Sequence, residues 1–280
     1  EDGIRDRSPS RGLGDVYKRQ GLMSDAELFG NQEMPERYRM ALESLDLILK
    51  LWREDAPLRW DGEQYGRSLE RRVWLNHGVG QFAHPLQQPH PPIAMAMVGP
   101  GGLTAETIAQ RDMIPISANF VPIENVVAQW RDYALGREKA GKVADRKVWR
   151  VCRNILVTET DDAGTELLAD PDGVIAHYFR YIRGVRRIEE FQTLQEEPLN
   201  ILNDFLEVPA ALEDCAIVGS ADTVLERLVD LVDHLGPFGM LVMVGHDWDE
   251  SGLSQRSMRC LAEDIPVSYT HLTLPTILLV

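Results

Sequence analysis

Residues 91–111, PPIAMAMVGPGGLTAETIAQR, decide the fold. The first eight, PPIAMAMV (91–98), form a short and nearly continuous apolar run that begins at two prolines. Such a run is typical of a strand that is buried on both faces. The glycine-rich loop from Gly99 to Gly102 follows, and the residues after it have the composition of a helix. The stretch therefore predicts a buried strand that turns directly into a helix.

The same order of strand and then helix recurs towards the C-terminus. The predicted strands are 91–98, 113–117, 149–160 and 238–245, and further helices are predicted at 123–141, 221–236 and 253–265. Parallel strands need crossover connections, which are usually helices, so this order indicates an α/β fold with a parallel sheet. Residues 160–213 are too long for a plain crossover and are predicted to be a helical insertion.

The two ends of the chain do not resemble the ends of a folded domain. Asp15 to Gln20 (DVYKRQ) and Val267 to Leu272 (VSYTHL) resemble translations, in opposite orientations, of one adaptor oligonucleotide used in transposase-based sequencing libraries. The alternative is that they are natural polar termini. We expect residues 1–20 and 267–280 to be adaptor-derived, and residues 21–266 to be a single domain cut at both ends.

Composition excludes several classes of protein. The net charge of −15 makes the surface acidic, and such a surface repels the phosphate backbone of nucleic acids. The cysteines are odd in number and widely spaced, so neither a disulfide framework nor a paired-cysteine zinc site is expected. No apolar run approaches the ~18 residues that a membrane helix needs. We therefore expect a cytoplasmic protein that binds neither nucleic acid nor membrane.

The loop at Gly99 to Thr104 is the strongest local candidate for a binding site. In parallel α/β proteins the ligand lies at the C-terminal ends of the strands, and this loop follows a predicted strand. It also precedes a predicted helix, whose free N–H groups and positive dipole end favour an anion. Glycine-rich turns are common, so a plain turn remains the alternative to a phosphate site.

A second candidate is GHDWDE (245–250), after the last predicted strand. His246, Asp247 and Asp249 have side chains that could ligate a metal. The two aspartates would equally suit the start of a helix, and the histidine could simply hydrogen-bond. Because no second ligand cluster accompanies them, no metal site is expected.

Taken in order, these segments resemble the bacterial-luciferase-like flavin monooxygenases, in particular the limonene-monooxygenase-like branch. The resemblance rests on GLMSDAELFG (21–30), ERYRMALESLDLILKLW (36–52), WDGEQY (60–65), QQPHPPIAMA (87–96), WRVCRNILVTET (149–160), IVGSADTVLERL (217–228) and FGMLVMVGHDW (238–248). Each motif alone is loose, but their order and spacing are specific.

The resemblance implies a (β/α)8 TIM barrel of the luciferase-like type, of which this chain holds only the C-terminal part, strands five to eight, with a helical insertion. It also implies an enzyme that binds reduced flavin at the strand C-termini and uses O₂ to oxygenate a small organic substrate. The implied cofactor is reduced FMN, with FAD as the alternative, supplied by an NAD(P)H-dependent flavin reductase. The whole protein is implied to be a homo-oligomer.

The resemblance also assigns roles to residues by position. The implied cofactor-binding residues are Gly21, Gly99, Gly101, Gly102, Leu103 and Thr104, and the implied substrate-binding residues are His246 and Trp248. Relatives often offer a serine hydroxyl near the position of Gly99, whereas this chain offers only backbone N–H groups and Thr104. The family's catalytic side chains lie largely in the first half of the barrel, so no catalytic residue is assigned.

Three other functions stay open. One is a reductase of the same superfamily that uses a deazaflavin, and another is a metal-dependent barrel hydrolase built on His246, Asp247 and Asp249. The third is a binding protein that keeps the barrel without its chemistry. Because four strands leave a barrel sheet open, we expect the chain alone to be inactive and poorly folded.

Overall fold

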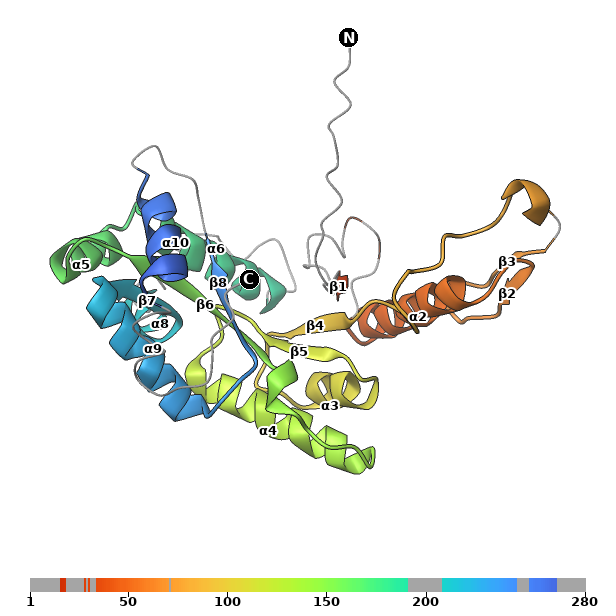
Figure 1. Cartoon of the computed structure of the whole chain (residues 1–280), viewed down its shortest axis with the longest axis horizontal. Helices are drawn as coiled ribbons and strands as arrows, with labels where there is room; N and C mark the ends of the chain where they lie inside the picture. Colours follow the sequence, from red (N-terminus) through yellow and green to blue (C-terminus); the bar gives the residue numbers. More distant parts are fainter. Residues whose placement is uncertain are drawn as a thin grey trace, which may run out of the picture. The chain divides into compact units, whose positions relative to one another are not determined.

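A computed structural model of the chain describes residues 16–18, 28, 30, 34–70, 72–190, 208–245 and 252–265 (Figure 1). The chain divides into two compact units, Glu1–Ala94 and Met95–Val280. The assignment of residues 21–266 to one domain, between adaptor-derived ends, stays a prediction.

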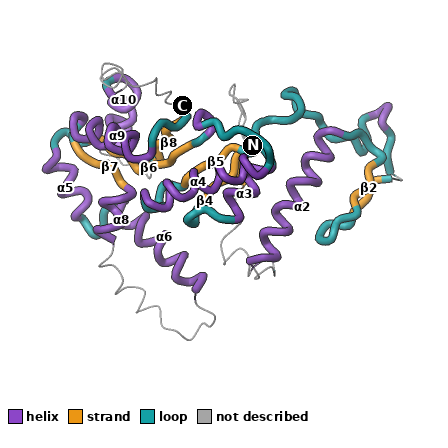
Figure 2. The backbone as a smooth tube through the Cα atoms, turned by 90° about the horizontal axis from the view of Figure 1, so that it is seen from below, coloured by secondary structure: helices purple, strands orange, loops and turns teal. Residues whose placement is uncertain are grey.

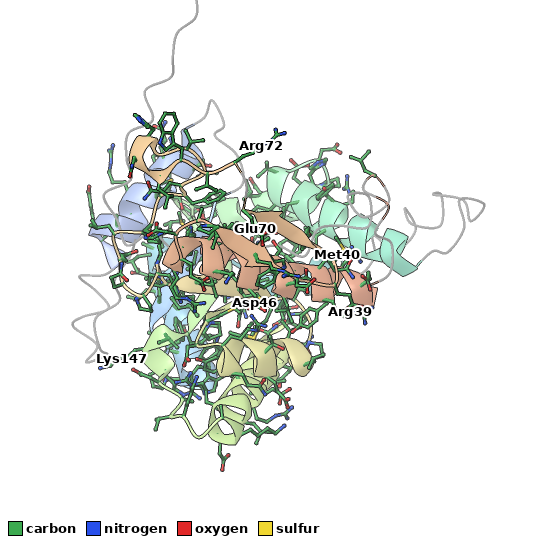
Figure 3. All side chains as sticks on the ribbon, turned by 90° about the vertical axis from the view of Figure 1, so that its right-hand side faces the viewer. Arg39, Met40, Asp46, Glu70, Arg72 and Lys147 are labelled. Atoms are coloured by element: carbon green, nitrogen blue, oxygen red, sulfur yellow. The ribbon has the colours of Figure 1, made fainter. Side chains whose placement is uncertain are left out.

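The first unit contains one long helix, α2 (Met34–Arg53). Its apolar residues recur at helical spacing, and Leu45 on this face is buried, whereas Arg39 is exposed (Figure 3). The described residues of the unit also form β1 (Val16–Lys18), β2 (Leu58–Trp60), β3 (Arg67–Leu69) and the 3-10 helix η1 (Leu75–His77). Strands β2 and β3 form an antiparallel pair in which Leu58 lies opposite Leu69.

A carboxylate on α2 organises the loop between β2 and β3. Glu43 accepts hydrogen bonds from Trp60 Nε1 at 3.2 Å and from the backbone N–H groups of Gln64 and Tyr65, both at 2.9 Å. Desolvation raises the pKa of Glu43, but the hydrogen bonds from Gln64 and Tyr65 outweigh it, so the pKa lies below its usual value. A Cβ on Gly62 would lie 2.0 Å from Glu43 Oε1, so a larger residue there would displace the carboxylate from its present position.

The second unit is a parallel sheet with helices packed on it (Figures 1 and 2). Its strands are β4 (Ile93–Met97, which crosses the division between the units), β5 (Ile114–Ser117), β6 (Arg150–Val157), β7 (Ala216–Gly219) and β8 (Met240–Val244). Its helices are α3 (Leu103–Gln110), α4 (Ile123–Lys139), η2 (Arg146–Val148), α5 (Asp161–Ala169), α6 (Val174–Glu190), α8 (Val208–Cys215), α9 (Ala221–Leu235) and α10 (Leu253–Glu263).

Strand β6 is paired in parallel with three strands, and the register shows on which edge each one lies. Arg150 is opposite both Ile116 of β5 and Met240 of β8, so these two strands lie on different edges of β6. Asn154 is opposite both Ala216 of β7 and Val244 of β8. It follows that β5 and β7 lie one after the other along one edge of β6, and β8 lies along the other edge.

The two faces of β6 have different surroundings. On one face Val151, Arg153 and Ile155 are buried, and just before the strand Trp149 stacks on Trp130 of α4 with the ring centroids 4.9 Å apart. On the other face Cys152 is only partly buried. One side of the sheet is therefore a packed helix–sheet core, and the other side is partly open.

The parallel α/β fold predicted from the sequence is confirmed, and each predicted strand is present. Strand β6 ends at Val157 rather than at residue 160. Strand β7 was not predicted, although all four of its residues, Ala216–Gly219, are buried. It was missed because a run of four residues next to a helix is too short to show strand periodicity. The described parts of 160–213 are helical, as predicted.

Within the described residues, no helix has both the length and the apolar composition needed to cross a bilayer.

Replacing Gly239 by alanine should destabilise the second unit. A Cβ at this position would lie 1.7 Å from the backbone carbonyl oxygen of Lys147, and moving the backbone away would strain the hydrogen bond from Gly239 N to Trp149 O at 3.0 Å. We expect Gly239→Ala to lower the free energy of unfolding by about 3 kcal/mol, measured by urea unfolding. The control is Gly99→Ala, because nothing lies within 4 Å of a Cβ there. Equal midpoints for the two variants would contradict the prediction.

Candidate functional site

The turn between β4 and α3 has a backbone that requires glycine at two positions. Gly101 has φ +115° and Gly102 has φ +70°, conformations that residues with a Cβ rarely adopt. Gly99 differs, because it does not have a positive φ and nothing lies within 4 Å of a Cβ built on it. The turn therefore has no room for a side chain at Gly101, whereas there is open space at Gly99 and at Gly102, where only the backbone conformation favours glycine.

Helix α3 begins at this turn with N–H groups that have no partner inside the helix. Gly102 is its N-cap and makes no side-chain cap, and the first helical hydrogen bond runs from Glu106 N to Gly102 O at 3.0 Å. The N–H groups of Leu103 and Thr104 thus have no partner within the helix. Together with the positive end of the helix dipole, they make this end of α3 suited to an anion.

Two side chains of helix α4 hydrogen-bond to the backbone of the turn. Gln129 Nε2 donates to Met97 O at 3.1 Å and to Gly99 O at 2.5 Å. Asp132 Oδ2 accepts a hydrogen bond from Gly102 N at 2.9 Å. The two ends of the turn are therefore fixed to one helix.

A buried amide pair lies where the strands end. Asn154 of β6 is opposite Val244, the last residue of β8, and Asn119 follows β5 by two residues. Asn119 Nδ2 donates to Asn154 Oδ1 at 2.6 Å and to Tyr178 Oη of α6 at 2.9 Å. Asn154 Nδ2 donates to the carbonyl oxygens of Asn119 at 3.0 Å and Cys215 at 2.8 Å. This network joins β5 and β6 to the helical insertion. It lies near the C-terminal ends of β5 and β8, the end of the strands at which barrel ligands bind.

A buried arginine, Arg153, lies on the face of β6 opposite to the face that carries Asn154. Arg153 is 1% exposed, and its Nη1 donates to Cys152 O at 3.1 Å and Val121 O at 3.4 Å. Its Nη2 has no partner among the described residues. Desolvation lowers the pKa of Arg153 below its usual value, while the nearby Cys215 and Asp214 oppose this shift.

Cys152, Cys215 and Cys260 are free thiols. Desolvation raises the pKa of Cys152 to about 11, so its thiol is protonated at neutral pH. Desolvation also raises the pKa of Cys260, with a further contribution from a hydrogen bond to Asp264. Neither thiol has the depressed pKa that a nucleophilic cysteine needs.

The structure brings part of the predicted site together. Gly99, Gly101, Gly102, Leu103 and Thr104 form the turn and the start of α3. Gly21, His246 and Trp248 lie outside the described residues, as do Asp247 and Asp249 of the alternative metal site. Over the described ranges, no group of histidine, cysteine, aspartate and glutamate side chains could hold a metal ion.

Sequence reasoning missed the polar residues that support this region. These are Asn119, Gln129, Asp132, Asn154 and Tyr178. Each is a single polar residue in a helix, strand or loop, with partners about thirty or more residues away in the sequence. The only available signal was the separation of three residues between Gln129 and Asp132, which places both on one face of a helix.

The sequence matches a family model described as luciferase-like monooxygenase over residues 19–236. It is 25% identical over 252 residues to 4-hydroxyprotoasukamycin monooxygenase of Streptomyces nodosus subsp. asukaensis, covering 86% of this chain and 61% of that protein. It is 23% identical over 248 residues to 3,6-diketocamphane 1,6-monooxygenase of Pseudomonas putida, covering 84% of this chain and 63% of that protein. The chain thus spans less than two thirds of the length of these relatives.

Solved structures share the fold. The oxygenating constituent of 3,6-diketocamphane monooxygenase from Pseudomonas putida, in complex with FMN, has a TM-score of 0.65 and 20% identity over 88% of this chain and 68% of that one. The monooxygenase RslO1 of Streptomyces bottropensis has a TM-score of 0.62 and 19% identity, covering 91% and 68%. An F420-dependent secondary alcohol dehydrogenase has a TM-score of 0.59 and 15% identity, covering 88% and 67%. At these identities the likeness concerns the fold alone.

Replacing Asn154 by aspartate should make the stability of the chain depend on pH. The new carboxylate would lie against the carbonyl oxygens of Asn119 and Cys215 in a buried site, so its pKa should be raised in the folded state. The folded state then binds more protons than the unfolded state between the two pKa values, so stability is lost as pH rises above ~4.

We expect Asn154→Asp to lose about 3 kcal/mol relative to the unchanged chain at pH 8 and clearly less at pH 5, measured by urea unfolding. Asn76→Asp is the control, because Asn76 is exposed. A loss that is equal at both pH values would show that the amide pair is not sensitive to charge.

Proposed function

The chain belongs to the luciferase-like monooxygenase family, and from this we propose that it is part of a flavin-dependent monooxygenase. The enzyme would use reduced FMN and O₂ to oxygenate a small organic substrate. The observation that carries the proposal is the family match over residues 19–236. The whole protein's activity and substrate are proposals because the chain spans 61% and 63% of its curated relatives.

The turn offers backbone N–H donors and open space that suit the phosphate of FMN. Nothing lies within 4 Å of a Cβ built on Gly99 or Gly102, so a ligand could approach the backbone there, whereas Asp132 fills the space beside Gly101. The N–H groups of Leu103 and Thr104 have no partner within the helix and are donors at its N-terminus. The carboxylate of Asp132 accepts from Gly102 N and opposes an anion, as does Glu106 in the first turn of α3.

When bound, FMN would supply the redox chemistry towards O₂ and the substrate. This chain's own residues would position it. The backbone donors at Leu103 and Thr104 would hold the phosphate end, and the buried amide pair of Asn119 and Asn154 would fix the strand ends around the site. His246 and Trp248 are proposed to line the substrate pocket, and Gly21 to lie near the cofactor.

We further propose that a separate NAD(P)H-dependent reductase supplies the reduced flavin. In support, one similar structure is described as the oxygenating constituent of its enzyme and holds FMN. Another similar structure is that of an F420-dependent enzyme, so a deazaflavin cofactor is the second candidate. A cytoplasmic location and a homo-oligomeric whole protein also remain proposals.

Direct titration of the 280-residue chain with FMN, FAD and a deazaflavin, followed by flavin fluorescence, tests the cofactor. FMN should bind tightest. Because the chain alone is expected to be inactive, the test measures binding only, and FMN reduced by a reductase and NADH under anaerobic conditions should bind with the same preference. Preferential binding of the deazaflavin would replace the proposal with a deazaflavin-dependent reductase, and binding of none of them would refute a flavin site in this chain.

A negative charge at Gly99 should weaken FMN binding. The position accepts a side chain without a clash, so Gly99→Asp adds a charge at the proposed phosphate site with little strain, and Gly99→Asn adds the same shape without the charge. We expect Gly99→Asp to raise the Kd for FMN at least about tenfold, and Gly99→Asn to change it much less. If both variants bind FMN like the unchanged chain, the phosphate does not lie at this turn.

A further inference from the structure

Two polar side chains on α4 point towards the glycine-rich turn. Gln129 and Asp132 are three residues apart, so they lie on one face of the helix about one turn apart. Between them they hydrogen-bond to the backbone at both ends of the turn. Neither residue belongs to the binding residues that the family resemblance assigned.

Gln129 fixes the start of the turn. Its side chain is fully buried, with Nε2 donating to Met97 O at 3.1 Å and to Gly99 O at 2.5 Å. A reversed amide would place its oxygen against these two carbonyl oxygens, so the orientation of the amide is fixed by its partners. Its Oε1 has no partner within the described part of the chain. A buried amide oxygen without a hydrogen bond destabilises the folded state. The two hydrogen bonds that Nε2 donates to the turn offset this loss.

Asp132 fixes the end of the turn. Its Oδ2 accepts from Gly102 N at 2.9 Å, and a Cβ on Gly101 would lie 2.5 Å from the same oxygen. The carboxylate therefore fills the space that a side chain at Gly101 would occupy. Desolvation raises the pKa of Asp132, but the hydrogen bonds from Gly102 and Arg131 outweigh it, so the pKa lies below its usual value and the group is ionised at neutral pH.

An ionised carboxylate beside a phosphate site has two opposite effects. Its hydrogen bond to Gly102 N orders the turn that begins α3, which favours any ligand bound by the N–H groups of Leu103 and Thr104. Its charge repels a phosphate monoester, which carries about −1.5 to −2 at pH 7. Arg131 is the neighbouring cation, but its side chain is 73% exposed and its charge is largely screened by water.

We propose that Gln129 and Asp132 are positioning residues for the phosphate of the flavin cofactor, and that the charge of Asp132 limits how tightly this phosphate is bound. The inference rests on the proposed function, since it assumes that flavin phosphate binds at this turn. It goes beyond that function by naming residues of α4 that set the geometry and the strength of the site.

The test compares binding of FMN and of riboflavin, which lacks the phosphate, by the 280-residue chain. Asp132→Asn keeps an oxygen acceptor for Gly102 N and removes the charge. It should bind FMN about three- to tenfold more tightly at low salt and bind riboflavin unchanged, with the gain shrinking in 1 M salt. Asp132→Ala also removes the charge but loses the hydrogen bond, so it should bind FMN about fivefold more weakly than Asp132→Asn.

Two further measurements separate positioning from a general structural role. Glu138→Gln removes an equal charge from an exposed position of α4 and should leave FMN affinity within twofold. Without any flavin, amide hydrogen exchange at Gly102 should be faster in Asp132→Ala than in Asp132→Asn. Gln129→Leu should weaken FMN binding more than riboflavin binding, provided that its melting curve remains cooperative. If its folding is lost, the Asp132 variants alone decide.

The outcomes separate this inference from the proposed function. If the unchanged chain binds no flavin, or binds riboflavin as tightly as FMN, the phosphate site fails and this inference fails with it. If the unchanged chain prefers FMN, but Asp132→Asn binds FMN with unchanged or lower affinity, the proposed function stands and this inference is overturned. Equal shifts for FMN and riboflavin in the Asp132 variants would also overturn it, because they would reflect a general structural effect.

Discussion

The sheet of the second unit depends on the length of one strand, β6. It has eight residues, whereas β5 and β7 have four each and β8 has five. On one edge of β6, β5 pairs with the first residues of the strand and β7 pairs with residues 154–157, beyond the end of β5. Strand β8 pairs with the other edge of β6. Each of these short strands gains its hydrogen-bond ladder from β6, so their relative positions follow from a single register. The helices that connect them are then placed by the strands that they join.

The difference between the two faces of β6 agrees with its role as a barrel strand. The face that carries Val151 and Ile155 packs against helices, next to the stacked rings of Trp149 and Trp130. The face that carries Cys152 is partly open. In a closed barrel the inner faces of opposite strands fill the interior together, so a strand within part of a barrel is expected to have one face that is only partly covered. The amide pair of Asn119 and Asn154 is buried, with Asn154 on this face and Asn119 hydrogen-bonded to Tyr178 of the insertion.

Most of the second unit could be predicted from the sequence because its signals are local. The apolar runs of β4 and β8 and the helix ended by Gly236 are complete within a dozen residues or so, and propensity and periodicity describe them well. Strand β7 gave no such signal, because its strand state comes from pairing with Asn154 to Val157 of β6. Short strands of this kind owe their state to a partner that is distant in the sequence.

The candidate site was predictable only in its backbone. Glycines mark a turn because they permit φ values that other residues avoid, and this can be read one residue at a time. The side chains that hold the turn cannot be read in this way. Asp132 is thirty residues from Gly102, and Gln129 is thirty-two from Met97, so nothing in the local sequence distinguishes them from ordinary polar residues of a surface helix. In the first unit, the contact between Glu43 and the loop at Gly62 could not be predicted for the same reason, because Glu43 is 21 residues from Gln64, to which it hydrogen-bonds.

The chemistry of the turn makes its geometry more important than its charge. The chain carries a net charge of −15, and the cation of Lys139 on α4 is paired with Glu106 of α3. An anion at the start of α3 would therefore depend mainly on uncharged N–H donors, whose strength as a site comes from convergence on one point rather than from long-range attraction. Convergence is lost if the turn can change shape, since each donor then points elsewhere for part of the time. Gln129, which is fully buried, and the carboxylate of Asp132 both hydrogen-bond to the turn and oppose such a change of shape. The site would then bind an anion through the arrangement of its N–H donors, although the net charge of the chain repels anions.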